Sequence, residues 1–109
     1  MALSPSVPYK PFLYQQLKDL DQAAAYLEVN LDELDKKFFL IALRDVVDAN
    51  GGILALSRKT RLSRPNLYRI LSENGNPEIM TLNKVLRAIG LSLSVKPLAV
   101  KRRGARQKA

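Results

Sequence analysis

The sequence contains no cysteine and no histidine. This excludes a disulfide, a thiolate nucleophile, an imidazole base and the usual zinc sites, and with them most of the chemistry of small enzymes. No apolar run approaches the roughly 18 residues of a membrane span, and the first twenty residues lack an apolar stretch after a basic start. We therefore expect a cytoplasmic protein that is not an enzyme and that needs no metal or cofactor.

The charge of the chain is distributed unevenly. A length of 109 residues with 47% hydrophobic content fits one small domain, and the formal net charge is +8. Residues 1–35 hold two basic and six acidic side chains, a net −4, which leaves +12 for the other 74 residues. The asymmetry indicates a basic module for a polyanion and an acidic front part with another task. Charge alone leaves open a surface that merely resists aggregation.

The two ends differ in composition from the middle of the chain. Residues 1–20 are interrupted by Pro5, Pro8 and Pro11, which favours an extended N-terminal arm. Residues 98–109 hold five basic side chains and little to bury, which predicts a flexible basic tail that adds nonspecific attraction to phosphate. The folded domain is therefore expected over residues 21–97.

Five amphipathic helices are predicted in this domain from apolar residues at the helical period. Their expected ranges are 21–34, 35–50, 53–60, 63–71 and 81–90. The second has the widest apolar stripe and ends at an Asn-Gly-Gly sequence, so it is expected to be the central core helix. The expected N-caps of the first, fourth and fifth helices are Asp21, Ser63 and Thr81.

The apolar period changes from 3.6 to 2 after Gly90, because Leu91, Leu93 and Val95 alternate with polar residues. This pattern predicts one short C-terminal β-strand. A single strand leaves backbone donors and acceptors unpaired, so its partner is expected in another chain, either a second copy or a different protein's sheet. An extended tail that packs on the helices is the alternative.

Residues 56–71 are predicted to form two short helices joined by a tight turn. Leu56, Leu62, Leu67 and Ile70 point inward and brace the two helices, which leaves the opposite face in solvent. That face suits a DNA major groove, because arginine pairs with guanine, asparagine with adenine, and hydroxyl groups with phosphates or base edges. The predicted base-reading residues are Ser63, Arg64, Asn66, Tyr68 and Arg69. The predicted phosphate-binding residues are Arg58, Lys59 and Arg61. On spacing alone, an ordinary solvated helical face is the alternative.

The stretch from Ala24 to Pro97 resembles the lambda-repressor-like, Xre-type helix-turn-helix family, and within it the HigA-type antidote proteins of type II toxin-antitoxin modules. The likeness lies in AAAYLEVNLDE at 23–33 and FFLIALRDVVDANGGILALSRKTRLSRPNLYRILSENGNPEIMTLNKVLRAIGLSLSVKP at 38–97. Two positions depart from the family pattern, which has alanine at Ser57 and glycine at Arg61. An arginine in a left-handed turn costs roughly 1 kcal/mol relative to glycine.

The resemblance implies an all-α, five-helix domain with a short C-terminal strand and flexible termini. It also implies a homodimer that represses its own operon at an inverted repeat and neutralises a small basic toxin of the RelE/ParE superfamily. Two recognition helices would meet half-sites about one helical turn apart, with the strand at Leu91, Leu93 and Val95 supporting the dimer. The acidic front part is the expected toxin contact. Its candidate anchors are Tyr9, Phe12, Leu13, Tyr14 and Leu17, unless they fold back onto the core.

Two other functions stay open. A stand-alone prophage-type regulator without a toxin partner would carry the same DNA surface, and a helical interaction module would present its basic face to protein or RNA. An enzyme is disfavoured, because Asp45 and Asp48 have no nucleophile or metal cluster beside them and are interpreted as solvated charges. A neighbouring gene for a small basic protein would distinguish an antitoxin from a plain regulator.

Overall fold

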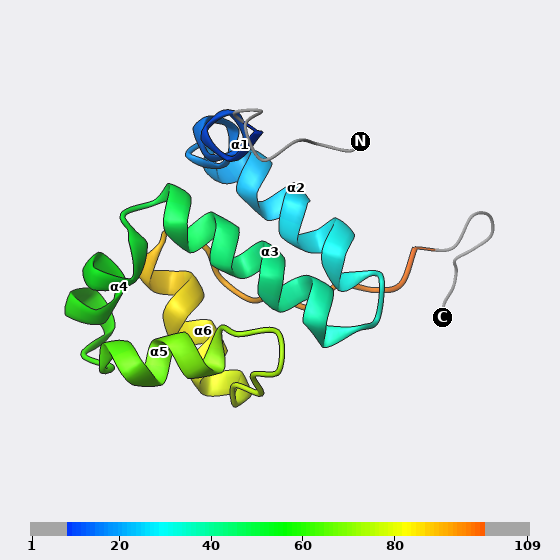
Figure 1. Cartoon of the computed structure of the whole chain (residues 1–109). Helices are drawn as coiled ribbons and strands as arrows, with labels where there is room; N and C mark the ends of the chain where they lie inside the picture. The colour runs from blue at the N-terminus through cyan, green and yellow to red at the C-terminus, as the bar shows by residue number, and fades with distance from the viewer. Residues whose placement is uncertain (1–8, 100–109) are drawn as a thin grey trace.

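The computed structural model describes residues 9–99, and this part of the chain is all-helical with no strand (Figure 1). Its helices are α1 (Tyr9–Leu17), α2 (Leu20–Leu31), α3 (Lys36–Ala49), α4 (Gly52–Thr60), α5 (Arg64–Ile70) and α6 (Ile79–Ala88). Helix α3 is central, because α1, α2 and α4 all pack on it, while α4 carries α5 and α6. The predicted all-α class is confirmed, whereas the predicted number of five helices is wrong.

The core forms around the apolar stripe of α3, as the sequence predicts. Leu43, Val46 and Val47 are fully buried, and burial of such a side chain stabilises the fold by about 1.5–3 kcal/mol. Asp35 caps the start of α3 by accepting a hydrogen bond from the backbone N–H of Lys37 at 2.9 Å. The helix ends where predicted, and the left-handed conformation that follows is one that glycine adopts without strain.

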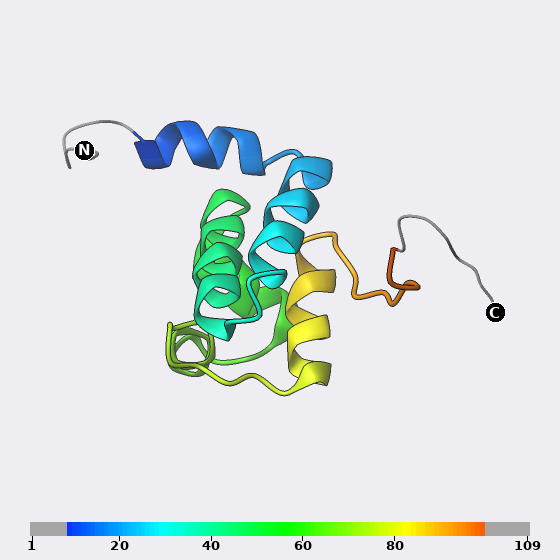
Figure 2. The same cartoon turned by 90° about the vertical axis from the view of Figure 1, so that its right-hand side faces the viewer.

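Residues 9–17 form α1, so the predicted extended arm over residues 1–20 is wrong for the part of it that is described. Pro11 is the third residue of this helix, in the first turn, where the missing N–H would have no intrahelical partner. Leu13 and Leu17 lie one turn apart and pack into the core. The side-chain amide of Asn50 donates to the backbone oxygen of Leu17 at 3.0 Å. In Figure 2, α1 consequently lies across the ends of α2 and α3.

The remaining parts of the predicted arm and the predicted basic tail, residues 1–8 and 100–109, lie outside the described residues.

Helix α2 begins and ends earlier than the sequence predicts. Asp19, and not Asp21, is the N-cap, and its carboxylate accepts from the backbone N–H groups of Asp21 at 2.9 Å and Gln22 at 3.3 Å. The helix ends at Leu31, and Leu34 lies beyond it with a positive φ of 59° and a 93% exposed side chain. The inner face of α2 is therefore shorter than the apolar spacing indicates.

Helices α4 and α5 are joined by residues 61–63, and the predicted packing of this pair is largely confirmed. Leu67 is 0% exposed, Leu56 and Ile70 are buried with it, and Leu62 is half-buried against the same core. The hydroxyl of Ser63 accepts from the backbone N–H of Asn66 at 3.2 Å, so the predicted N-cap of α5 is confirmed.

Helix α6 starts at Ile79, with Glu78 and not Thr81 at the N-cap position. The turn before it requires glycine at position 75, because a Cβ there would lie 2.2 Å from the backbone oxygen of Ile70. None of the helices in residues 9–99 is long and apolar enough to cross a membrane.

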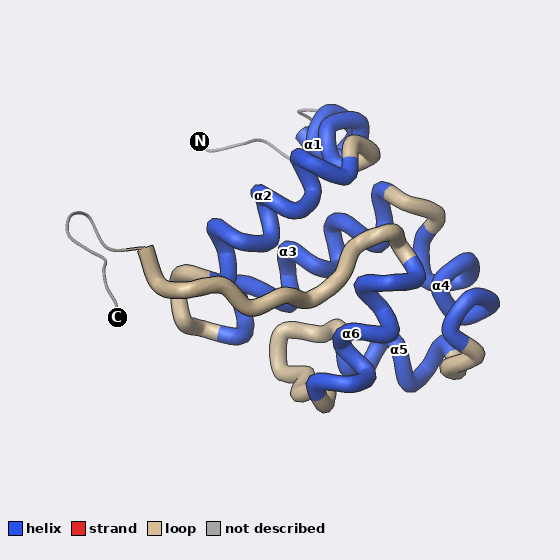
Figure 3. Tube along the Cα trace, turned by 180° about the vertical axis from the view of Figure 1, so that it is seen from behind, coloured by secondary structure: helices blue, strands red, loops and turns tan. Residues whose placement is uncertain are grey.

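Residues 91–99 form a loop and not the predicted strand (Figure 3). The loop runs over the back of the bundle, where the N–H of Leu91 donates to the oxygen of Leu86 at 2.9 Å and the N–H of Leu93 donates to Asn83 Oδ1 at 3.2 Å. The described part of the chain holds no other extended segment that pairs with residues 91–99, so the ladder hydrogen bonds that define a strand are absent there. At Leu91 the structure agrees with the alternative, an extended tail packed on the helices, because this side chain is half-buried against the core.

The turn between α4 and α5 keeps the left-handed geometry despite its arginine. Arg61 has φ 66° and ψ 15°, and its backbone N–H donates to the oxygen of Ser57 at 2.8 Å. The hydroxyl of Ser57 donates across the turn to the oxygen of Leu62 at 2.6 Å. The Arg61 strain expected from the sequence is therefore present and is held by the surrounding hydrogen bonds.

We predict that Arg61→Gly raises the free energy of unfolding by up to about 1 kcal/mol, because glycine adopts this φ without a Cβ clash. Urea denaturation measures the change. Arg61→Ala is the matched control: it removes the same charge but keeps the Cβ, so it should bring no gain. Equal stabilisation by both variants would mean that charge repulsion, and not backbone strain, is relieved.

Candidate nucleic-acid interface

All five predicted base-reading residues lie on α5 or at its N-cap, and none of them is buried. Ser63, Arg64 and Arg69 are exposed, Asn66 is half-buried, and the side chain of Tyr68 is 49% exposed. Because Leu67 and Ile70 face the core, these side chains lie on the outer side of α5 and its N-cap, which we call the α5 surface. The structure therefore brings together the side chains that the sequence grouped.

Contacts within the α5 surface restrict three of its side chains. A terminal nitrogen of Arg69 donates to Asn66 Oδ1, one helical turn earlier. The Ser63 hydroxyl accepts one hydrogen bond for the helix cap, so its own proton and its second lone pair remain for an outside partner. The surface is thus partly ordered before any ligand is present.

The three predicted phosphate-binding residues flank this surface. Arg58 and Lys59 are exposed in the last turn of α4, and Arg61 is exposed in the turn that follows. Together with Arg64 and Arg69 they place five cationic side chains along α4, the turn and α5. A strip of this composition attracts a polyanion.

Arg44 of α3 adjoins the α5 surface, although the sequence does not predict it as a site residue. Its guanidinium carbon lies 5.0 Å from the centroid of the Tyr68 ring, within the range of a cation–π interaction. Its Nε donates to Asp48 Oδ1 at 3.1 Å. The i, i+4 spacing of Arg44 and Asp48 was a visible signal for the ion pair, but nothing in the sequence linked this pair to Tyr68.

The interpretation of Asp45 as a solvated charge is wrong. This residue is 5% exposed, and its carboxylate accepts from Lys10 Nζ at 2.7 Å and from the hydroxyl of Tyr26 at 2.9 Å. Asp48 is partly buried and accepts from the hydroxyl of Tyr14 at 3.4 Å. The two carboxylates therefore hold α1 and α2 on α3.

The contact with Asp45 raises the pKa of Lys10 above its ordinary value, chiefly through the hydrogen bond to the carboxylate. Burial raises the pKa of Tyr14. For both groups the folded state holds its proton to a higher pH than the unfolded state does. The stability that these shifts contribute is therefore present at neutral pH and is lost as the pH rises above about 10.

The predicted toxin anchors separate into different environments. Leu13 and Leu17 are buried in the core and Tyr14 packs on it with its hydroxyl on Asp48, so these three fold back onto the chain. For Leu13 and Leu17 the structure therefore shows the alternative, in which they fold back onto the core. Phe12 is 67% exposed. The side chain of Tyr9 lies outside the described part of the structure.

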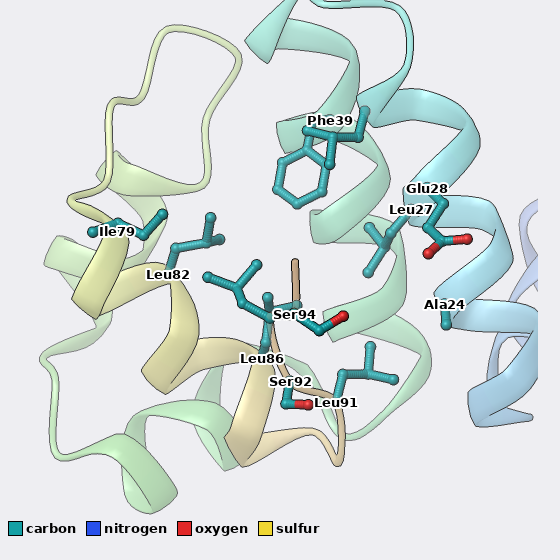
Figure 4. A pocket seen from close by; sticks show the side chains of 12 residues that line it. Ala24, Leu27, Glu28, Phe39, Ile79, Leu82, Leu86, Leu91, Ser92 and Ser94 are labelled. Carbon is teal, nitrogen blue, oxygen red and sulfur yellow. The ribbon is translucent and has the colours of Figure 1, made fainter. Parts of the chain in front are cut away.

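An apolar groove of about 280 Å³ lies between α2, α6 and the loop that follows α6 (Figure 4). Leu27 of α2, Phe39 of α3 and Leu86 of α6 point into it, and Leu91, Ser92 and Ser94 close one side. Beyond the groove the loop is exposed to solvent, and the side chain of Val95 is 99% exposed. Among residues 9–99 no group of acidic side chains is arranged to hold a metal ion.

These features define a small helical protein with a basic, solvent-exposed helix-turn-helix pair on one face. Residues 10–97 match the family described as "probable addiction module antidote protein". A protein of Haemophilus influenzae, named only "uncharacterized protein", is 34% identical over 90 residues, which cover 74% of this chain and 92% of the relative. No solved structure gives a significant match. The chain belongs to the addiction module antidote family, and this membership supports an antitoxin role.

We predict that Asp45→Asn lowers the free energy of unfolding by about 2 kcal/mol at neutral pH, because a buried acceptor of two hydrogen bonds loses its charge. Most of the loss should come from the Tyr26 bond, since the Lys10 side chain is 57% exposed and its ion pair is screened by water. Urea denaturation at pH 7 and at a pH above the raised pKa of Lys10 measures the difference between variant and unmodified chain under each condition. The difference from the unmodified chain should narrow at the higher pH, where Lys10 is deprotonated.

Glu33→Gln is the control for this experiment, because it removes one negative charge from an exposed side chain. It should leave stability within about 0.5 kcal/mol of the unmodified chain. An equal loss in both variants would show that net charge, and not the buried contact, is responsible.

Proposed function

We propose that this protein is a DNA-binding antitoxin that represses its own operon and neutralises a toxin of the RelE/ParE type. The observation that carries the DNA-binding part is the α5 surface, held outward by Leu67 and flanked by the basic end of α4. In helix-turn-helix proteins the second helix enters the major groove with its N-terminal residues on base edges, and the first helix crosses the backbone. The order of α4 and α5 fits these two positions.

Each side chain of the α5 surface has a chemically suited target. Arg64 and Arg69 each offer paired donors to the two acceptors of guanine, and Asn66 offers a donor and an acceptor to adenine. Tyr68 and Ser63 carry hydroxyl groups that suit a phosphate or a base edge. Arg69 donates a hydrogen bond to Asn66 in the free chain. On DNA the two side chains would either break this bond and each contact a base, or keep it and contact neighbouring bases as a pair.

The protein would act on DNA as a homodimer, with two α5 helices in half-sites of an inverted repeat about one helical turn apart. The segment holding Leu91, Leu93 and Val95 is the proposed contact with the second copy. Two features support this: Val95 is almost completely exposed, and the segment borders the apolar groove of Figure 4. Pairing of two such segments would give hydrogen-bond partners to backbone N–H and C=O groups that no strand of the described chain can pair with.

The toxin contact is proposed on the acidic front part of the chain, with Phe12 of α1 as its exposed aromatic anchor. The acidic side chains Asp19, Asp21 and Glu28 are exposed on the same part of the chain. A toxin that binds RNA carries positive charge, so an acidic surface with an aromatic group suits it. Family membership supports a toxin partner in general.

For DNA binding we predict that the full-length chain selects an inverted repeat from a pool of random duplexes, with two chains on each bound duplex. Arg69→Ala should weaken binding to the selected duplex by about 1–3 kcal/mol and relax the preference at one base pair of each half-site. With about six phosphate contacts, log affinity should fall with log salt at a slope near −5. Electrophoretic mobility shift and fluorescence anisotropy provide these measurements.

Arg87→Ala is the matched control, since it removes an exposed arginine from α6 and should leave sequence preference unchanged. If no sequence is enriched and duplex affinity is independent of salt, DNA reading is excluded. Selective binding of RNA or protein by the same basic face would then favour a helical interaction module.

For toxin binding we predict that the chain co-purifies with the small basic protein encoded beside it when the two are expressed together. Phe12→Asp should weaken this complex at least tenfold, because it places a charge in a desolvated contact. Met80→Asp on α6 changes a side chain of similar exposure and should have little effect. Titration calorimetry measures both affinities. If no gene for a small basic protein lies beside the gene for this chain, or if the two proteins do not co-purify, the toxin contact is overturned and a plain transcriptional regulator is favoured.

A further inference from the structure

Arg44 is the residue through which the core helix α3 contacts the side chain of Tyr68 on α5. Its guanidinium lies over the Tyr68 ring at 5.0 Å, while its Nε is held by Asp48 at 3.1 Å. The Arg44 side chain is therefore fixed on both sides, by a carboxylate of its own helix and by an aromatic ring of another. A tyrosine on an exposed helix face would otherwise exchange between rotamers.

The remaining donors of Arg44 are directed to neither of these contacts. Only Nε takes part in the ion pair with Asp48, and within residues 9–99 neither terminal nitrogen has a hydrogen-bond partner. The side chain is 35% exposed, so water or a ligand can reach these two nitrogens. Two parallel N–H groups on a planar guanidinium match the geometry of a phosphate.

We propose that Arg44 is a positioning residue of the DNA-reading surface: it fixes the orientation of the Tyr68 ring and binds the phosphate beside the base that Tyr68 contacts. This inference rests on the proposed DNA binding by α5. It adds a residue from the core helix to a surface that the sequence confines to α4, the turn and α5. Asp48 sets the position of Arg44 and also accepts a hydrogen bond from Tyr14 of α1. The α5 surface is therefore linked, through Arg44 and Asp48, to the contacts that hold α1 on α3.

Arg44→Lys separates the two parts of this role, because lysine keeps the charge but cannot bond Asp48 through Nε while stacking its plane on the ring. The ratio of affinities for the selected duplex and a scrambled duplex should fall about fivefold to tenfold, by loss of ring positioning. The salt slope should stay as in the unmodified chain. Arg44→Gln should lower affinity for both duplexes and reduce the salt slope by about 1.8, which corresponds to one phosphate contact in each of the two half-sites.

Tyr68→Leu tests whether the Arg44 effect on specificity passes through the ring. In a Tyr68→Leu chain, adding Arg44→Lys should change the affinity ratio less than twofold, because no ring remains to be positioned. Arg87→Gln is the control for loss of an exposed arginine and should leave the affinity ratio and the slope unchanged. NMR of chains with ¹³C-labelled tyrosine rings reports the ring itself: the Tyr68 signals should shift in Arg44→Lys without DNA.

The outcomes separate this inference from the proposed function. If the unmodified chain selects a sequence and Arg44→Lys keeps both its affinity ratio and its Tyr68 ring signals, Arg44 does not position the ring. An unchanged salt slope in Arg44→Gln overturns the phosphate contact. If the unmodified chain selects no sequence, DNA reading fails first and the role of Arg44 in it fails with it, even where the ring signals shift.

Discussion

The burial of Leu67 is the constraint on which the α5 surface, the proposed DNA-reading surface, depends. At 100° per residue, the neighbours of an inward-pointing residue on a helix are turned well away from the core. Asn66, Tyr68 and Arg69 are therefore carried outward by the packing of one leucine, which is 0% exposed against α4 and the core. A helix as short as α5 has little stability of its own, so this packing, with the Ser63 cap, also keeps it helical.

The angle between α4 and α5 depends on a turn that is strained at Arg61. A non-glycine residue in the left-handed region persists where its surroundings determine the backbone. Here the N–H of Arg61 is held by Ser57, the hydroxyl of Ser57 holds Leu62, and the N–H of Leu62 donates to the buried hydroxyl of Thr60 at 3.2 Å. The side chain of Ser57 thus supplies a hydrogen bond across the strained turn.

Local signals in the sequence were sufficient for the middle of the chain. The stripe of α3, its glycine end and the Ser63 cap depend on residues close together, and the structure has all three. The exposed positions of α5, which hold the candidate site residues, could be predicted because the inward positions of one short helix determine its outward positions. Helix α1 is not predicted from the sequence, because three prolines near one another disfavour a helix. Pro11 falls in the first turn, however, where a helix tolerates it, and Leu13 and Leu17 have the i, i+4 spacing of a buried face.

The failures share a physical cause, which is tertiary contact. Alternation over residues 91–95 indicates a strand only if another strand pairs with it, and the described chain offers none. Asp45 looks solvated in the sequence because the partners that surround it, Lys10 and Tyr26, are 35 and 19 residues away. Arg44 was missed for the same reason, since its ring contact lies on a helix that the sequence separates from it by a turn and another helix.

Asp45 and Asp48 of α3 each contact a different set of side chains, and together they join α1 and α2 to α3. An ion pair with a partly exposed partner is a weak source of stability, because water screens the attraction, but its geometry still restricts where the two side chains can lie. Asp45 accepts from α1 and α2 together, so it fixes where both helices lie on α3. Asp48 accepts from Tyr14 of α1 on one oxygen and from Arg44 on the other, and Arg44 meets Tyr68. The placement of α1, the proposed toxin-binding part, and the order of the α5 surface therefore depend on neighbouring side chains of one core helix.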